Sequence, residues 1–416
     1  MRHSTSTSPV AIDQQDERLI TPHTFGEYWK AFVARVSKGD LGSLPVVVGL
    51  VIIWAVFQVL NPFFLSSANL VNLALECAAI GTIAIGVVLV LLVAQIDLSI
   101  GSLGGLASAI LAVGFVHHGW PLWLAVVAGI AAGALIGLLY GIIYTRFGVP
   151  TFVITLAGLL GFLGLQLWVL GTNGSINIPF DSWLVAFAQQ SFLPPIASYA
   201  LVLVAVVLYG GSSYLRARAR AAGGLTATST MEISVKTGLL LVLLGVSTWY
   251  LNLTRGIGVM FMVFVVLVVL TNYALTRTRW GRDVYAVGGN VEAARRAGIK
   301  VNRIFVSVLV LGATFAAVGG IFATARLASA GVSSGGGDTN LVAIAAAVIG
   351  GTSLFGGRGN AWSALLGIVV IQSIASGLTL LSLDSSIRYM ITGAVLLLAV
   401  IIDSLSRRSR ASHGQA

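Results

Sequence analysis

The chain has 416 residues, of which 57% are hydrophobic and only 9% are charged. Because soluble domains carry about 25% charged residues, this composition excludes a globular protein with a fully wetted surface. It predicts an all-α, polytopic membrane helix bundle. The net charge of +10 lies in short segments between apolar runs, which indicates orientation in a bilayer and argues against nucleic-acid binding. The only cysteine is Cys77, so an internal disulfide and a cysteine-cluster metal site are excluded.

Residues 1–42 predict a cytoplasmic N-terminal extension, because they are polar and lack the short apolar core of a signal peptide. Within this extension, residues 24–38 carry aromatic and aliphatic side chains at roughly helical spacing. The spacing predicts either an interfacial helix or a plain lead-in to the first span, and the sequence leaves both open.

A membrane-spanning helix needs about 20 mostly apolar residues. Twelve such runs follow one another, near 44–60, 71–94, 99–117, 122–145, 151–170, 198–214, 237–253, 257–275, 304–325, 340–355, 361–381 and 387–403. Two places are ambiguous: Gln95–Leu98 is either a tight turn or a break within the membrane, and 340–361 is either a crossing pair or re-entrant. We therefore expect ten to twelve spans in a transmembrane domain over 43–405, followed by a cytoplasmic tail over 406–416.

Lysine and arginine indicate the orientation of the chain. With the N-terminus inside, the cytoplasmic segments hold 21 of the 24 basic residues, and the outer segments hold Arg255, Arg326 and Arg388. Positive residues concentrate on the cytoplasmic side of membrane proteins. The bias therefore predicts that both termini, and a charged segment over 276–303, are cytoplasmic.

The chain has no Gly-x-x-x-x-Gly-Lys-Ser/Thr pattern, and no Gly-Lys pair occurs anywhere in it. It therefore lacks the loop that cradles ATP phosphates. The five histidines show no metal-ligand spacing, and no pattern of nucleophile and base stands out. We expect no catalytic residues, no metal site and no cofactor in this chain, and hence no enzymatic activity of its own.

Glycine recurs every four residues on the run 122–145, at Gly129, Gly133, Gly137 and Gly141. Such a stripe lets the backbone of a neighbouring helix approach closely. Static packing and an interface that slides during transport both fit the pattern.

Polar residues near the spans are the candidates for a translocation path. A carboxylate in hydrocarbon is costly unless it faces protein, water or substrate, which singles out Glu76 and Asp97. Asp97 with Ser99 also fits helix capping, and Glu76 fits an interfacial position. Amides and Trp168 near the end of the run 151–170 suit a sugar, although an aromatic belt also explains the ring. The full set is Glu76, Asp97, Ser99, Gln166, Asn173, Thr352 and Ser353.

The segment 281–298 is compact, charged and punctuated by glycine between two long apolar runs. Asn290 is a favoured residue just before a helix, Glu292 lies where the helix dipole favours an acid, and Gly298 fits the helix end. We expect a two-turn helix with Arg295 and Arg296 exposed. It is either an ordinary loop helix or a docking site for another protein.

Four blocks resemble the ribose/xylose-type permeases of bacterial ATP-binding-cassette importers. Gly281–Ile299 resembles the cytoplasmic coupling region of that family. Three further blocks are similar to its motifs and stand in the same order as in the family: Ile96–Ser102, Val149–Gly158 and Ile344–Gly359. The pair of runs over 198–253, with a basic loop between them, is most similar to the D-xylose permeases.

The resemblance implies the permease subunit of an ATP-driven, binding-protein-dependent importer of a monosaccharide, a pentose such as D-xylose, in the bacterial plasma membrane. Its implied partners are a cytoplasmic ATPase that carries ATP and magnesium, an extracytoplasmic sugar-binding protein, a second permease subunit in a homodimer, and membrane lipid. The residues implied to couple to the ATPase are Gly288, Gly289, Asn290, Glu292, Ala293, Ala294, Arg295 and Gly298.

The chain departs from the family's pattern near the expected translocation path. Leu163 stands where an arginine is common, and Asn340 and Val342 stand where acidic residues are common. These departures bear on the identity of the sugar and not on the coupling segment. An ion-coupled secondary sugar transporter and a non-transporting membrane sensor or scaffold are the alternative functions.

Overall fold

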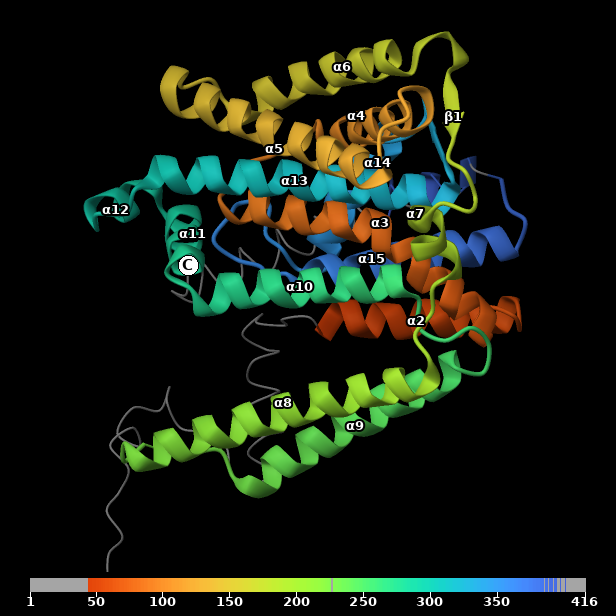
Figure 1. Ribbon diagram of the computed structural model, residues 1–416. Coiled ribbons are helices and arrows are strands. Elements are labelled where there is room, and N and C mark those ends of the chain that lie inside the picture. The colour runs from red at the N-terminus through yellow and green to blue at the C-terminus, as the bar shows by residue number, and fades with distance from the viewer. Residues whose placement is uncertain are drawn as a thin grey trace, which may run out of the picture. The chain divides into compact units, whose positions relative to one another are not determined.

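The computed structural model describes residues 44–225 and 227–384, together with separate positions between 386 and 401. The expected interfacial helix over 24–38, the tail over 406–416 and most of the span expected over 387–403 lie outside the described residues. The described part is almost entirely helical and contains one two-stranded sheet (Figure 1). Nine of its helices are long and apolar enough to cross a membrane. The predicted all-α, polytopic membrane bundle is therefore confirmed.

The chain divides into two compact units, and the described part of the smaller one is Leu193–Gly256. It is a hairpin of two helices, α8 (Pro195–Ala222) and α9 (Thr230–Leu251). Gly210 of α8 packs against the side chain of Thr237 of α9. The hairpin corresponds to the pair of spans expected over 198–253.

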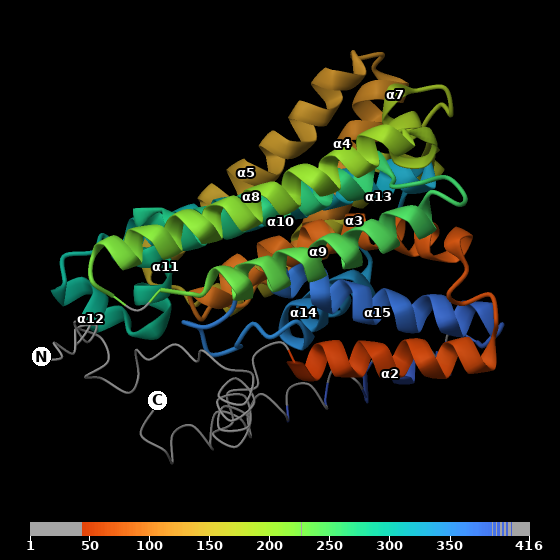
Figure 2. The ribbon, with the colours of Figure 1, turned by 90° about the horizontal axis from the view of Figure 1, so that it is seen from below.

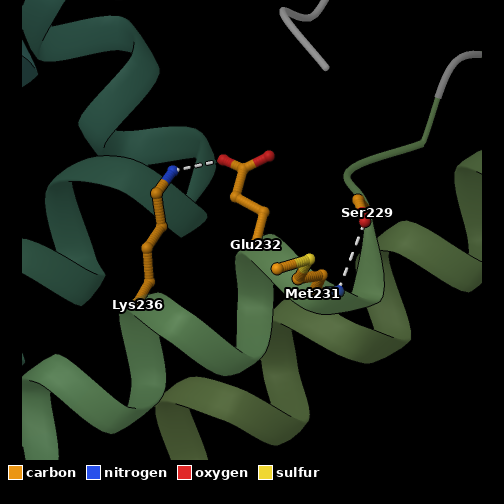
Figure 3. Close-up of polar contacts among 4 residues, drawn as sticks. All are labelled: Ser229, Met231, Glu232 and Lys236. Carbon is orange, nitrogen blue, oxygen red and sulfur yellow. Dashed lines mark hydrogen bonds and ion pairs between the residues drawn. The ribbon is translucent and has the colours of Figure 1, made fainter. Parts of the chain in front are cut away.

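The start of α9 is fixed by polar contacts of its own residues (Figure 3). The hydroxyl of Ser229 accepts the N–H of Met231 at 3.3 Å, which satisfies a backbone donor that the first turn leaves free. Glu232 in that turn forms an ion pair of 2.5 Å with Lys236. An acid at this position also interacts favourably with the helix dipole.

The larger unit holds the remaining helices. They are α2 (Leu44–Leu60), α3 (Ser67–Leu92), α4 (Ile100–Ala112), α5 (Leu122–Phe147), α6 (Thr151–Leu170), α7 (Trp183–Val185), α10 (Val259–Arg277), α11 (Arg279–Gly289), α12 (Val291–Arg296), α13 (Val301–Leu327), α14 (Gly337–Ile349) and α15 (Trp362–Leu380). Single π-helical turns continue α4 over Val113–His117 and α7 over Ala186–Gln190, and a 3-10 turn over Gly171–Asn173 follows α6.

Helices α3 and α13 form the centre of the larger unit and run side by side in both views (Figure 1, Figure 2). Small residues permit their close approach: Gly86 lies against the carbonyl group of Gly312, and Gly319 lies against that of Ala79. Lipid tails are as apolar as the side chains, so helices in a membrane associate through packing of this kind.

The four glycines of the predicted stripe on α5 all face α13 or α4: Gly129, Gly133, Gly137 and Gly141. A Cβ added at Gly137 would lie 2.5 Å from the carbonyl oxygen of Leu309 and 2.7 Å from the Cα of Val310. Only glycine permits the two backbones to approach so closely.

In both ambiguous regions of the sequence, one helix ends and an irregular connection leads to the next helix. Residues 93–99 form an irregular connection between α3 and α4, longer than a tight turn. Helix α14 has 13 residues, and it therefore extends only about 20 Å. The N–H of Gly101, near the start of α4, donates to Oδ1 of Asn340, near the start of α14. The two helix starts thus meet inside the unit.

A short sheet lies at the C-terminal end of α13, whereas α11 and α12 precede the N-terminal end of this helix. Strand β1 (Ser175–Asn177) pairs antiparallel with strand β2 (Ser329–Gly331), and Ile176 stands opposite Ala330. This sheet was not predicted, because strands of three residues leave no readable alternation in the sequence.

Candidate docking and translocation sites

Two short helices, α11 and α12, form most of the charged segment over 276–303. Thr278 precedes α11, and its hydroxyl accepts the N–H of Gly281 at 3.1 Å. Asn290 separates the helices, and its side chain accepts the N–H of Ala293 at 2.9 Å. The predicted helix start at Asn290 is confirmed. Helix α11 was missed, because its glycines at both ends are more typical of a loop.

Gly298 ends the second helix. Its φ of +81° lies in the left-handed region, which glycine adopts without strain. Its N–H donates to the carbonyl of Arg295 at 3.0 Å, and the N–H of Ile299 donates to that of Ala294 at 3.1 Å. The predicted C-terminal cap is confirmed, and it turns the chain into α13.

The residues assigned to coupling divide into two groups by exposure. Gly288 and Ala294 face the chain's own bundle, and Ala294 belongs to its apolar core. The other six are exposed: Gly289, Asn290, Glu292, Ala293, Arg295 and Gly298. Only the exposed group is accessible to a second protein.

Glu292 and Arg295 carry charge on the exposed face of α12. Oε1 of Glu292 lies 2.8 Å from Nη1 of Arg295, and the two side chains are 66% and 59% exposed. An ion pair that is so exposed contributes at most about 1 kcal/mol. A partner protein can therefore rearrange the pair at little cost.

Helix α11 is attached to two different elements of the larger unit. Near its start, Nε1 of Trp280 donates to Oγ of Ser307 in α13 at 2.8 Å. Further along, the hydroxyl of Tyr285 donates to the carbonyl of Gly359 at 2.8 Å. A tyrosine hydroxyl is protonated at neutral pH, and burial raises the pKa of Tyr285 further, so the hydroxyl remains a donor.

Gly288 lies against the end of α3 and against a glycine-rich loop over 350–361. A Cβ added at Gly288 would overlap the carbonyl oxygen of Leu92, and the same oxygen accepts the N–H of Gly357 at 2.9 Å. Gly357 has a φ of +69°, a conformation that favours glycine. The loop therefore reaches the end of the bundle at which α11 lies.

Thr352 and Ser353 lie in this loop. The N–H of Thr352 donates to the carbonyl of Ala347, and that of Ser353 donates to the carbonyl of Arg358, both at 3.0 Å. Thr352 also packs against Gly359, whose carbonyl accepts the hydroxyl of Tyr285 of α11, so the two residues lie near α11. The sequence identified the motif but not the element against which it packs.

Asp97 and Ser99 form a buried hydrogen-bonded group with Tyr140 of α5. Oδ1 of Asp97 accepts the N–H of Ser99 at 2.8 Å and its hydroxyl at 2.7 Å. Oγ of Ser99 in turn accepts the hydroxyl of Tyr140 at 2.8 Å. The group holds Ser99, the residue before α4, but no side chain caps a backbone N–H of the first turn of α4, so the capping interpretation is not confirmed. The sequence analysis did not single out Tyr140. Its only signal in the sequence is its position next to Gly141 of the glycine stripe.

Gln166 fastens α6 to the segment that follows β2. Its Nε2 donates to the carbonyls of Gly331 and Ser334, both at 2.9 Å. Its buried Oε1 has no hydrogen-bond partner among the residues that the structure describes. Trp168 is 79% exposed, as an aromatic belt requires, and the side chain of Asn173 lies outside the described part.

Glu76 stands apart from these groups. It is exposed on α3, and Arg326 of α13 is its electrostatic neighbour. Six of the seven residues predicted for one translocation path therefore occupy four places: Glu76 on α3, Asp97 with Ser99, Gln166 beside β2, and Thr352 with Ser353 beside α11.

Residues 69–400 match the protein family described as branched-chain amino acid transport system, permease component. The xylose transport system permease protein of Escherichia coli (strain K12) is 34% identical over 345 residues, which cover 83% of this chain and 87% of that protein. The same-named protein of Haemophilus influenzae is 34% identical over 378 residues, 90% of this chain and 99% of that protein. The ribose import permease protein of Bacillus subtilis is 32% identical over 366 residues, 88% of this chain and 94% of that protein. No solved structure matches the chain.

Proposed function

Since the chain belongs to this family of transport-system permease components, we propose that it is the permease subunit of an ATP-driven, binding-protein-dependent importer of a monosaccharide. D-xylose is the first candidate cargo. The family description names branched-chain amino acids, whereas relatives that align over most of the chain are named for xylose and ribose. Because the alignments cover 83% of the chain or more, the sugar names carry more weight than the family's general description.

The observation that carries the proposal is the α11–α12 segment. A permease component of this family works with an ATPase and a binding protein, and the sequence has no phosphate-binding loop of its own. The exposed face of α12 offers small residues and one loosely held charge pair, Glu292 with Arg295. We place this face in the cytoplasm because of the lysine and arginine bias. ATP and magnesium then bind to the ATPase and not to this chain.

The polar candidates contribute to transport in different ways. Glu76 is an exposed residue of α3, and Oε1 of Gln166 has no hydrogen-bond partner among the described residues, so we assign these two to the translocation path. Asp97 and Ser99 are hydrogen-bonded to each other, and we assign them a structural role in the connection that leads into α4. A second copy of this chain is the proposed partner in the bacterial plasma membrane, with lipid around the exposed apolar faces.

Purification of the tagged chain from membranes of its own host tests the assignment. An ATPase chain should co-purify, and Glu292→Lys should lower its recovery because it reverses a charge on the exposed face of α12. Glu232→Lys is the control, since Glu232 also pairs with a basic residue about one turn away, but in α9. Repeated purifications without any ATPase would contradict the proposed function.

The cargo is tested by uptake competition among xylose, ribose, arabinose and galactose. Xylose should compete most strongly. Uptake that survives loss of the ATPase and stops when the ion gradient is dissipated would refute ATP-driven import. Competition by branched-chain amino acids and not by sugars would overturn the cargo class.

A further inference from the structure

The glycine-rich loop over 350–361 joins the docking segment to two membrane helices. Near its start, the N–H of Thr352 donates to the carbonyl of Ala347 in α14 at 3.0 Å. Gly350 packs against the backbone of Ser363 in α15, so closely that a Cβ there would overlap the carbonyl oxygen. The loop is therefore packed against both helices as well as covalently continuous with them.

Helix α11 contacts this loop in two ways. The first contact is directional: the hydroxyl of Tyr285 donates to the carbonyl of Gly359 at 2.8 Å. The second is steric: a Cβ added at Gly288 would lie 2.8 Å from the backbone nitrogen of Gly357, besides overlapping Leu92 at the end of α3, and a Cβ added at Gly356 would lie 2.8 Å from the carbonyl oxygen of Gly288. Backbone atoms cannot rotate aside, so this contact tolerates no added side chain.

We propose that Tyr285 and Gly288 are positioning residues that couple α11 to the loop over 350–361, so that movement of the docking helices is passed to α14 and α15. This inference rests on the proposed function, because it requires an ATPase docked on α12. It separates two roles within one segment. Exposed residues of α12 hold the ATPase. Tyr285 and Gly288 face the bundle and transmit the movement of α11 and α12 to it.

The test uses the complete importer in liposomes, with its ATPase and its sugar-binding protein, and xylose as the cargo. Three quantities are measured: ATPase retained on the permease, ATP hydrolysed, and sugar transported. Tyr285→Phe keeps the ring and removes one hydrogen bond, so the sugar transported per ATP should fall by about two- to tenfold. Gly288→Ala displaces α11 from its contact, and the ratio should fall by about two- to thirtyfold. Retention of the ATPase should stay at the parental level in both variants.

Two further variants serve as controls. Gly161→Ala lies in α6, where an added Cβ meets nothing within 4 Å, and it should keep the parental ratio. Trp280→Phe removes the bond from α11 to Ser307 of α13, and it should lower the ratio less than Tyr285→Phe does. An equal or larger fall with Trp280→Phe would overturn the proposal, because transmission would then run through α13.

The proposal is also overturned if Tyr285→Phe and Gly288→Ala both transport as much sugar per ATP hydrolysed as the unaltered protein. So does a loss of ATPase retention that accounts for the whole fall, because the two residues would then belong to the docking surface. If Gly288→Ala does not fold, Tyr285→Phe decides alone, since it removes a single oxygen. Failure of the unaltered chain to retain any ATPase refutes the proposed function itself, which distinguishes the two failures.

Discussion

Replacing Gly137 by alanine tests whether the stripe on α5 is a close-packed contact. The added methyl group would lie 2.5 Å from the carbonyl oxygen of Leu309 and 2.7 Å from the Cα of Val310. Because both obstacles are backbone atoms, α5 and α13 must move apart. Overpacking of this kind costs about 1–3 kcal/mol.

Gly161→Ala in α6 is the matched control for this substitution. An added Cβ meets nothing within 4 Å there, and both glycines lie inside membrane-spanning helices. Alanine is a better helix former than glycine by about 1 kcal/mol, and this gain is common to both variants. Their free energies of unfolding should therefore differ by about 1–3 kcal/mol, with Gly137→Ala the less stable.

Titration of detergent-solubilised protein with SDS gives the two free energies of unfolding. Equal values would refute the close approach of α5 and α13. Sugar uptake in vesicles then distinguishes the two interpretations of the stripe. If the contact is static, uptake per folded molecule of Gly137→Ala stays near the parental value. If the contact slides during transport, uptake falls further than the loss of folded protein explains.

Three further predictions use the same preparations. Gln166→Leu should lower the free energy of unfolding by about 1–3 kcal/mol, because one buried and one partly buried carbonyl group lose their donor. Trp168→Leu, on an exposed side chain, should change it much less in the same titration. Tyr140→Phe should cost about 0.5–1.5 kcal/mol, because Ser99 loses the phenol donor; an unchanged midpoint would contradict that bond. Asn290→Ala should destabilise α12 by about 1 kcal/mol and lower the recovery of the ATPase in co-purification. Parental recovery would show that α12 does not need its cap for docking.

Elements with a local signal could be predicted from the sequence. A cap acts on backbone groups two or three residues away, so Asn290 and Gly298 identified both ends of α12. The membrane-spanning helices also have a local signal, because about 20 consecutive apolar residues are enough for a helix to cross the membrane. The stripe from Gly129 to Gly141 needed only the spacing of four that places residues on one helix face.

Contacts between distant segments could not be predicted in this way. Gly288 and Gly289 are equivalent in the sequence, yet an added Cβ overlaps Leu92 at the first and meets nothing within 4 Å at the second. Tyr140 bonds to Ser99, which stands 41 positions away. Such roles depend on which helices become neighbours, and apolar runs of similar length do not specify their neighbours.

The hydrogen bonds of Asp97 bear on the alternative of a transporter driven by an ion gradient. Such a transporter needs a carboxylate at membrane depth that exchanges an ion or proton with a water-filled path. Asp97 is buried and engaged by Ser99, whose hydroxyl is itself held by Tyr140. Releasing the carboxylate would disrupt this whole group, and Glu76 is exposed elsewhere, beside Arg326. Within the part of the chain that the structure describes, Asp97 and Glu76 therefore do not form the paired acidic site that would favour ion coupling through these two residues.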